Sequence, residues 1–245
     1  TANSSGKKMI AFLNTLSKTR SQVQRISQQR TLRDYASLRI LYITPRYYPY
    51  VGGLEYVVKS IAERFVRREN EVVVLAGESS INKSIKEIIN GVKVWRWPVW
   101  SPGEAYHIPK RRRELTETLR RLIKSTDIIH IHSAHTLFSV WSGLKIVRNG
   151  GDRIVFTMHY HGTGHTLARK ILWLWWRGRV KQLITEHVDV VHTVSKLEAE
   201  LVERDFGIKA VSVENGVEEW ILNYNWEPSD YIMYSGRIER YKNLD

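Results

Sequence analysis

The stretch that decides the fold runs from residue 38 to residue 65 and reads LRILYIT-PRYYPYVGGLE-YVVKSIAERF. Its first seven residues are almost continuously apolar, which is typical of a strand that is covered on both faces. The stretch therefore predicts a buried strand, a tight turn with two glycines and an amphipathic helix. The helical spacing is carried by Val57, Val58, Ile61, Ala62 and Phe65.

The same alternation of short apolar runs and longer amphipathic segments continues along the chain. A second helical stripe lies at Leu115, Leu119, Leu122 and Ile123. Strands and helices in alternation predict βαβ units and a Rossmann-like, doubly wound parallel sheet of the α/β class. We expect strands at residues 38–44, 71–76, 92–97, 127–132, 153–159, 189–194, 210–213 and 231–234.

Composition limits the class of protein. The 245 residues carry a formal net charge of +13 and contain no cysteine. The lack of cysteine excludes a disulfide-stapled scaffold and a cysteine zinc site, and it makes a reducing, cytoplasmic compartment the default. No apolar run approaches the ~20 residues that span a bilayer. We therefore expect a basic cytoplasmic protein that binds phosphates or an anionic lipid surface.

The positive charge is concentrated in residues 1–37, 108–124 and 165–182. Residues 1–37 place apolar side chains opposite cations on a helix, which predicts a basic amphipathic N-terminal extension. Residues 167–184 are apolar all round the helix axis, so we expect the sheet on one side and the inner face of the cell membrane on the other. An ordinary core helix with solvated charges is the alternative. The side chains expected at the membrane are Trp173, Trp175, Trp176, Arg177 and Arg179.

The glycine turn is a candidate binding site for an anion. Gly52 and Gly53 permit positive φ angles and leave the backbone N–H groups at the start of a helix uncovered. A purely structural tight turn would give the same pattern.

Histidines form the second candidate site. His130 and His132, and then His159 and His161, lie at or just past the carboxyl ends of predicted strands, where open α/β sheets bind ligands. Carboxylates are nearly absent there, which favours hydrogen bonds to sugar or phosphate, or general acid–base roles, over metal binding. His130 lies inside its strand and is best explained as a structural histidine.

Over residues 38–245 the chain resembles the family 4 glycosyltransferases, which are retaining enzymes of the GT-B fold. The resemblance depends on the order of its motifs. After the Gly-Gly-Leu-Glu turn come DIIHIH at residues 127–132, TMH at 157–159, DVVHTVS at 189–195, NGV at 215–217, and Gly236-Arg237 with Lys242.

The resemblance implies two Rossmann-like domains that face each other across a cleft. The first would bind the acceptor, and the second would bind a UDP-, GDP- or ADP-sugar. It implies that Gly52 and Gly53 approach the donor phosphates and the acceptor, and that His159 is the catalytic histidine near the transferred sugar. Arg237 and Lys242 would neutralise the leaving diphosphate. Contacts with the acceptor or the sugar are expected from His132, His161 and Asn215.

The domain prediction follows from these motifs. Residues 1–37 are the extension, residues 38–220 the acceptor-side domain, and residues 221–245 a linker with the first strand of a second domain. The nucleotide-sugar pocket would belong to that second domain, so we expect residues 1–245 to be inactive alone. We expect no metal and no other cofactor, because no Asp-x-Asp occurs to hold a divalent ion on the diphosphate.

The expected partners are a nucleotide-sugar, a glycan or lipid-linked acceptor and an anionic membrane surface, with no nucleic acid. Three alternatives remain open at this point: a basic nucleic-acid- or membrane-binding module, a histidine-based metal-dependent hydrolase, and a non-catalytic homologue.

Overall fold

The computed structural model describes residues 37–104, 106–162, 167–224, 227–228 and 230–234. The predicted N-terminal extension lies almost entirely outside them. The strands are β1 (Arg39–Thr44), β2 (Glu71–Glu78), β3 (Ile85–Ile89), β4 (Val92–Trp100), β5 (Ile108–Pro109), β6 (Ile128–His132), β7 (Ile154–Thr157), β8 (Val190–Thr193) and β9 (Val211–Ser212). The longer helices are α3 (Gly53–Arg67), α4 (Arg112–Ile123), α5 (Leu137–Arg148), α6 (Leu167–Glu186) and α7 (Lys196–Phe206).

The sheet confirms the predicted Rossmann-like α/β class. Its order is β3-β4-β2-β1-β6-β7-β8-β9, and β5 pairs with the last two residues of β4, Val99 and Trp100. Every pairing is parallel except those of β3 and β5 with β4. Helices join β1 to β2, β6 to β7, β7 to β8 and β8 to β9, as βαβ units require, whereas the parallel pair β2 and β4 is connected through β3.

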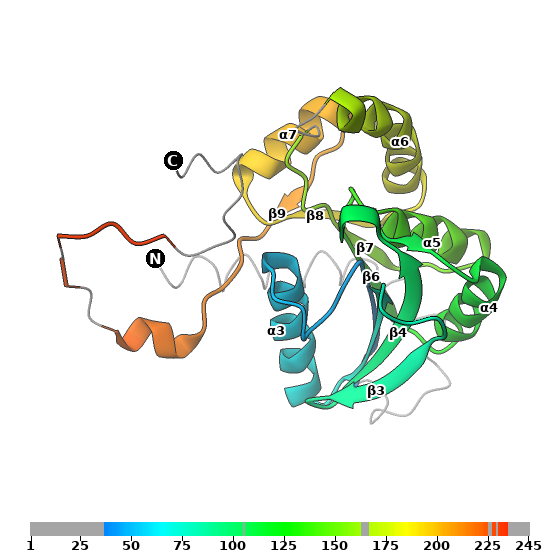
Figure 1. The fold of residues 1–245 in the computed structure, drawn as a ribbon, viewed down its shortest axis with the longest axis horizontal. Helices are drawn as coiled ribbons and strands as arrows, with labels where there is room; N and C mark the ends of the chain where they lie inside the picture. The colour runs from blue at the N-terminus through cyan, green and yellow to red at the C-terminus, as the bar shows by residue number, and fades with distance from the viewer. Residues whose placement is uncertain (1–36, 105, 163–166, 225–226, 229, 235–245) are drawn as a thin grey trace, which may run out of the picture.

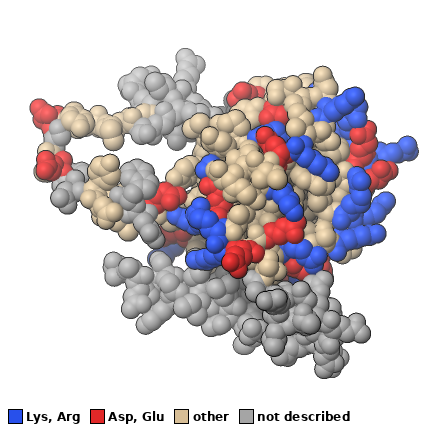
Figure 2. Space-filling model, turned by 90° about the horizontal axis from the view of Figure 1, so that it is seen from below, with Lys and Arg blue, Asp and Glu red and all other residues tan. Residues whose placement is uncertain are grey.

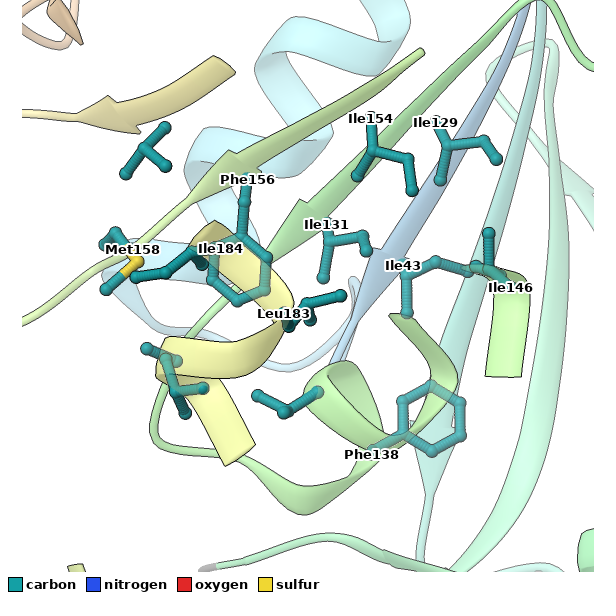
Figure 3. Packing of buried hydrophobic residues seen from close by; sticks show 14 of the residues in the cluster. Ile43, Ile129, Ile131, Phe138, Ile146, Ile154, Phe156, Met158, Leu183 and Ile184 are labelled. Carbon is teal, nitrogen blue, oxygen red and sulfur yellow. The ribbon is translucent and has the colours of Figure 1, made fainter. Parts of the chain in front are cut away.

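Helices cover both faces of the sheet, as Figure 1 shows. On β1 the side chains alternate: Ile40 and Tyr42 face α3, whereas Leu41 and Ile43 belong to the larger core on the opposite face. Figure 3 shows the larger core, where Phe138 of α5 and Leu183 of α6 pack near strand residues such as Ile131. This division fixes the direction in which each strand-end side chain points.

The sequence-based prediction does not include the antiparallel strand β3 at the edge of the sheet. β3 and β4 form a hairpin around Asn90 and Gly91, which both have positive φ angles of 50° and 82°. An Asn-Gly pair between apolar runs is a strong signal for such a two-residue turn. The hairpin is absent from the prediction because strands were assigned from continuous apolar runs, and β3 is mostly exposed and has no such run.

The strand predicted at residues 231–234 is wrong. These residues are exposed and take no part in the sheet, whose last described strand in that direction is β9. An apolar run becomes a strand when a neighbouring strand satisfies its backbone N–H and C=O groups, and none of the described strands lies beside this one.

No helix among the described residues is long and apolar enough to cross a membrane.

Candidate functional site

The candidate site lies at the topological switch point of the sheet, where the connections that leave two neighbouring strands run to opposite sides. β1 and β6 are neighbours, with Ile43 opposite Ile131. The chain leaves β1 through α3 toward β2, on one side, and leaves β6 through α5 toward β7, on the other. In open α/β sheets this arrangement opens a crevice at the carboxyl ends of the strands, and ligands bind there. The glycine turn, His132 and the loop after β7 lie at the carboxyl ends of β1, β6 and β7.

The glycine turn leaves the N-terminus of α3 open. Gly52 is extended, with φ −171° and ψ 162°, and Gly53 is the first helical residue. Neither glycine has the positive φ that glycine permits. A Cβ at Gly52 would collide with the Glu55 carboxylate, whereas a Cβ at Gly53 would meet no atom within 4 Å. Because no side chain caps the helix, its first N–H groups are accessible to an anion from the side of Gly53.

A buried ionic network anchors the loop that precedes this turn. Arg96 of β4 donates from Nη2 to the Tyr48 carbonyl at 2.6 Å and pairs with Glu87. Tyr50 donates its hydroxyl to Glu78 Oε1 at 2.7 Å. Sequence reasoning missed this anchor because Arg96 lies 48 residues from Tyr48 in the sequence. The network holds residues 45–52 in place beside the ends of β2 and β4.

A row of imidazoles crosses the ends of β6, β7 and β8. His130 Nε2 lies 2.7 Å from the Thr157 hydroxyl, which lies 2.8 Å from His192 Nδ1. His192 Nε2 lies 3.2 Å from the Val213 carbonyl, which can only accept. His192 therefore donates from Nε2, its Nδ1 accepts from Thr157, and Thr157 accepts from His130. His130 is thus a satisfied structural histidine, and burial lowers its pKa to about 3.

The proposed catalytic histidine lies next to this row. His159 follows β7 in the left-handed region, with φ 46°, and its Nε2 is 3.1 Å from His132 Nδ1. Burial, together with repulsion from His192, lowers the pKa of His159 to about 4, so the ring is neutral at pH 7. His132 is 1% exposed. It therefore cannot reach an acceptor in this conformation, contrary to the sequence-based expectation, because its ring fills the space under His159.

The remaining predicted contacts are distributed around the same edge. His161 is exposed, with its ring 4.4 Å from that of His135. Asn215 is exposed on the loop after β9, two residues beyond the Val213 carbonyl that His192 contacts. Arg237 and Lys242 lie outside the described residues. The structure therefore brings His159, His161 and Asn215 to the carboxyl edge, and leaves the two cations untested.

Glu198 of α7 is a site residue that sequence reasoning missed. Its buried carboxylate accepts from the backbone N–H of Tyr160 at 2.6 Å and from that of Val194 at 2.8 Å. It thereby joins the loop after β7 to the loop after β8. Ser195 caps α7 by accepting from the Glu198 N–H, and this Ser-x-x-Glu pattern is the sequence signal that could have identified it.

Two of the tryptophans predicted to lie at a membrane are in the core instead. Trp173 is 5% exposed and Trp176 is 9% exposed, because they share the sheet-facing side of α6 with Val180 and Leu183. Trp175 is 68% exposed. The outward face of α6 is nevertheless apolar and basic, and its exposed residues include Ile171, Leu172, Leu174, Trp175, Lys170, Arg179 and Lys181, while Arg177 is partly buried.

Basic side chains also gather on α4, which packs against α5, as α6 does. Residues 110–113 of the α4 start and Arg120, Arg121 and Lys124 are exposed. Figure 2 shows Lys and Arg gathered on the side of the molecule where Figure 1 places α4 and α5. Within the described ranges, no group of three or more His, Asp or Glu side chains is placed to hold a metal ion.

Comparison with known families identifies one match. A sequence profile of Glycosyltransferase Family 4 matches residues 51–219, which is more than half of the chain and includes the glycine turn and His159. No curated protein matches the chain in sequence.

Some solved structures are similar to the chain at low identity. A sucrose-phosphate synthase from Thermosynechococcus elongatus is 17% identical, with 76% of this chain and 92% of that chain covered and a TM-score of 0.45. The catalytic domain of Starch Synthase IV from Arabidopsis thaliana is 18% identical, with coverages of 74% and 52% and a TM-score of 0.47. An alpha,alpha-trehalose-phosphate synthase from Burkholderia vietnamiensis is 11% identical, with coverages of 69% and 42% and a TM-score of 0.42. The chain thus spans about half, or less, of the last two structures.

The buried imidazoles predict a fold that weakens in mild acid. Burial lowers the pKa of His130 and of His135 to about 3, and that of His159 to about 4, from an ordinary value of 6.5. The unfolded chain therefore binds more protons between pH 6.5 and pH 4, and stability is full above pH 6.5 and falls as the pH falls. We expect a loss on the order of 2 kcal/mol per ring at pH 4.5.

Urea unfolding at pH 7.5 and pH 4.5 measures this loss. The variant His130→Gln should show a smaller difference between the two pH values than the unchanged chain. Equal unfolding free energies at the two pH values would contradict the assignment of neutral, buried rings.

Proposed function

The chain belongs to glycosyltransferase family 4, and on that basis we propose that it is the acceptor-side half of a retaining GT-B enzyme. In this proposal the enzyme moves a hexose from a nucleotide-sugar to a lipid-linked or other membrane-proximal acceptor. Residues 38–220 form the acceptor-side domain, and residues 221–245 lead into a second domain that binds the nucleotide. One observation carries the proposal: the uncapped N-terminus of α3 opens at the topological switch point, and His159 follows β7, two strands along the same edge of the sheet.

The helix terminus suits the phosphates of the donor. The first N–H groups of α3 and the partial positive charge of the helix end favour an anion, and the empty space at Gly53 lets a phosphate oxygen approach the backbone. Gly52 leaves room for the Glu55 carboxylate, which a Cβ at that position would meet, so the anion would approach from the side of Gly53. A UDP-, GDP- or ADP-sugar carries the diphosphate that this surface would bind.

Departure of the diphosphate is the step that needs charge stabilisation. As the bond between the sugar and the diphosphate breaks, negative charge grows on the leaving oxygen, and fixed positive groups lower the barrier. In our proposal Arg237 and Lys242 supply that charge together with the α3 terminus, without a divalent cation. His159 contacts the transferred sugar, and His161 and Asn215 contact the sugar or the acceptor from the same edge.

The outward face of α6 suits an anionic membrane. Ile171, Leu174 and Trp175 can enter the headgroup region, while Lys170, Arg179 and Lys181 contact the phosphates of the lipids. No acidic residue lies between Lys170 and Thr185 to oppose this contact. The enzyme would then act as a peripheral protein on the cytoplasmic side of the membrane, close to a lipid-linked acceptor.

The catalytic proposal predicts a large effect of one histidine. In the protein with both domains, His159→Ala should lower kcat for hexose transfer by about 100-fold or more, because a group that contacts the reacting sugar is lost. His187→Ala, at the end of α6 and away from the site, is the matched control and should leave kcat unchanged. Residues 1–245 alone should give no product with UDP-, GDP- or ADP-hexose. Transfer by residues 1–245 alone would contradict the division into two halves.

The membrane proposal predicts that replacing Trp175 weakens vesicle binding, whereas replacing the neighbouring Trp176 lowers the stability of the fold. Trp175→Ala should weaken binding to phosphatidylglycerol-containing vesicles by roughly tenfold and leave the unfolding free energy unchanged, because Trp175 is exposed. Trp176→Ala removes a core side chain and should lower the unfolding free energy by about 3–5 kcal/mol. Vesicle co-sedimentation and urea unfolding measure the two quantities. If the unchanged chain fails to bind these vesicles, the proposal is wrong.

A further inference from the structure

His132 is a buried imidazole whose hydrogen bond runs to another imidazole. It ends β6, and its Nδ1 lies 3.1 Å from His159 Nε2, with the two rings stacked at a centroid distance of 5.4 Å. Its other nitrogen, Nε2, is buried and has no hydrogen-bond partner among the described residues. The rings of Tyr42 and His130 fill the space on its other sides, at centroid distances of 5.8 Å and 4.1 Å.

The position of one proton follows from this arrangement. Each neutral ring carries a single N–H, so the pair has two hydrogen-bonded forms. If His159 donates from Nε2, then His132 must carry its own proton on Nε2, as a buried donor with no acceptor. If His132 donates from Nδ1, its Nε2 is left without a proton. Buried donors without a partner are rarer in proteins than incompletely paired acceptors, which favours the second form.

We propose that His132 is a positioning residue that holds His159 as the neutral tautomer with its proton on Nδ1. This proposal rests on the proposed function, in which His159 contacts the transferred sugar. His132 occupies Nε2 of His159 as a donor, so the remaining nitrogen of His159 presents an N–H group. His159 then meets the substrate as a hydrogen-bond donor to a hydroxyl or phosphate oxygen.

The backbone around His159 is fixed, so the ring has little freedom to choose another partner. The Met158 N–H donates to the His192 carbonyl at 3.0 Å, and the Met158 carbonyl accepts from Ala134 at 2.9 Å. On the other side of His159, the Tyr160 N–H donates to Glu198 at 2.6 Å. These bonds keep His159 in the left-handed region, where a non-glycine residue needs support from its surroundings.

The proton position can be measured directly in the chain itself. Long-range ¹H–¹⁵N correlation spectra of the chain labelled with ¹⁵N-histidine, recorded at pH 7, distinguish protonated from unprotonated ring nitrogens. We expect His159 to be protonated on Nδ1 and unprotonated on Nε2, and His132 to be protonated on Nδ1. Protonation of His159 on Nε2 would overturn the proposal. Because no substrate is present, this result does not depend on glycosyl transfer.

Variants test whether His132 is the cause. In His132→Leu, which has no donor, we expect His159 to shift toward the Nε2-protonated form. In His132→Gln, whose amide can donate, we expect the Nδ1 form to be retained. His187→Gln is the control, because His187 follows α6 at the opposite edge of the sheet and has no contact with either ring. An unchanged His159 tautomer in His132→Leu would overturn the assigned role, and the spectrum of the unchanged chain decides the proton position if that variant does not fold.

The role in catalysis has a separate readout. In the two-domain protein, we expect His132→Leu to lower kcat about tenfold with little change in the KM of the donor, and His132→Gln to restore most of it. If the tautomer is as expected but kcat of His132→Leu is unchanged, the positioning role is wrong. If the protein transfers no sugar at all, the proposed function fails while the proton assignment stands.

Discussion

β1 and β6 lie side by side in parallel, and their connections run to opposite sides of the sheet. That pairing sets Ile40–Ile43 opposite Ile128–Ile131, and it depends on apolar side chains on the larger core face: Leu41, Ile43, Ile129 and Ile131. The chain leaves the two strands in opposite directions, which is the arrangement in which open α/β sheets bind ligands at the carboxyl ends of the strands. The open N-terminus of α3 and the imidazoles after β6 and β7 owe their positions to this pairing.

The buried histidines at this edge affect both the stability of the fold and the hydrogen-bonding groups of the site. Each ring that loses water needs a hydrogen-bond partner, and Thr157, His192 and the Val213 carbonyl supply a continuous series of partners. Burial keeps the rings neutral, so the stability of the fold depends on pH, and the hydrogen bonds give the site donors and acceptors of fixed direction. His159 has both properties: its backbone is held by Glu198 and its ring by His132.

Periodicity in the sequence was sufficient to predict the central parallel strands, α3, α4 and the strand-end positions of the histidines, because these features are local. It could not assign the two faces of α6. Apolar side chains surround that helix, so only tertiary packing decides that Trp173 and Trp176 are buried and Trp175 is exposed. The burial of His132 and the anchoring of the glycine loop by Arg96 also depend on residues far apart in the sequence. The Asn90-Gly91 hairpin was visible in the sequence and was overlooked.

The central claim is that the carboxyl edge at the switch point is the surface that binds the donor phosphates. Backbone amide shifts of the ¹⁵N-labelled chain, followed during titration with inorganic pyrophosphate and with UDP-glucose, test it most directly. The account predicts concerted, saturable shifts at Gly52, Gly53 and Leu54, with His159 also shifting for UDP-glucose. Shifts confined to the exposed basic residues 110–113, or no saturable shifts at the turn, would contradict it.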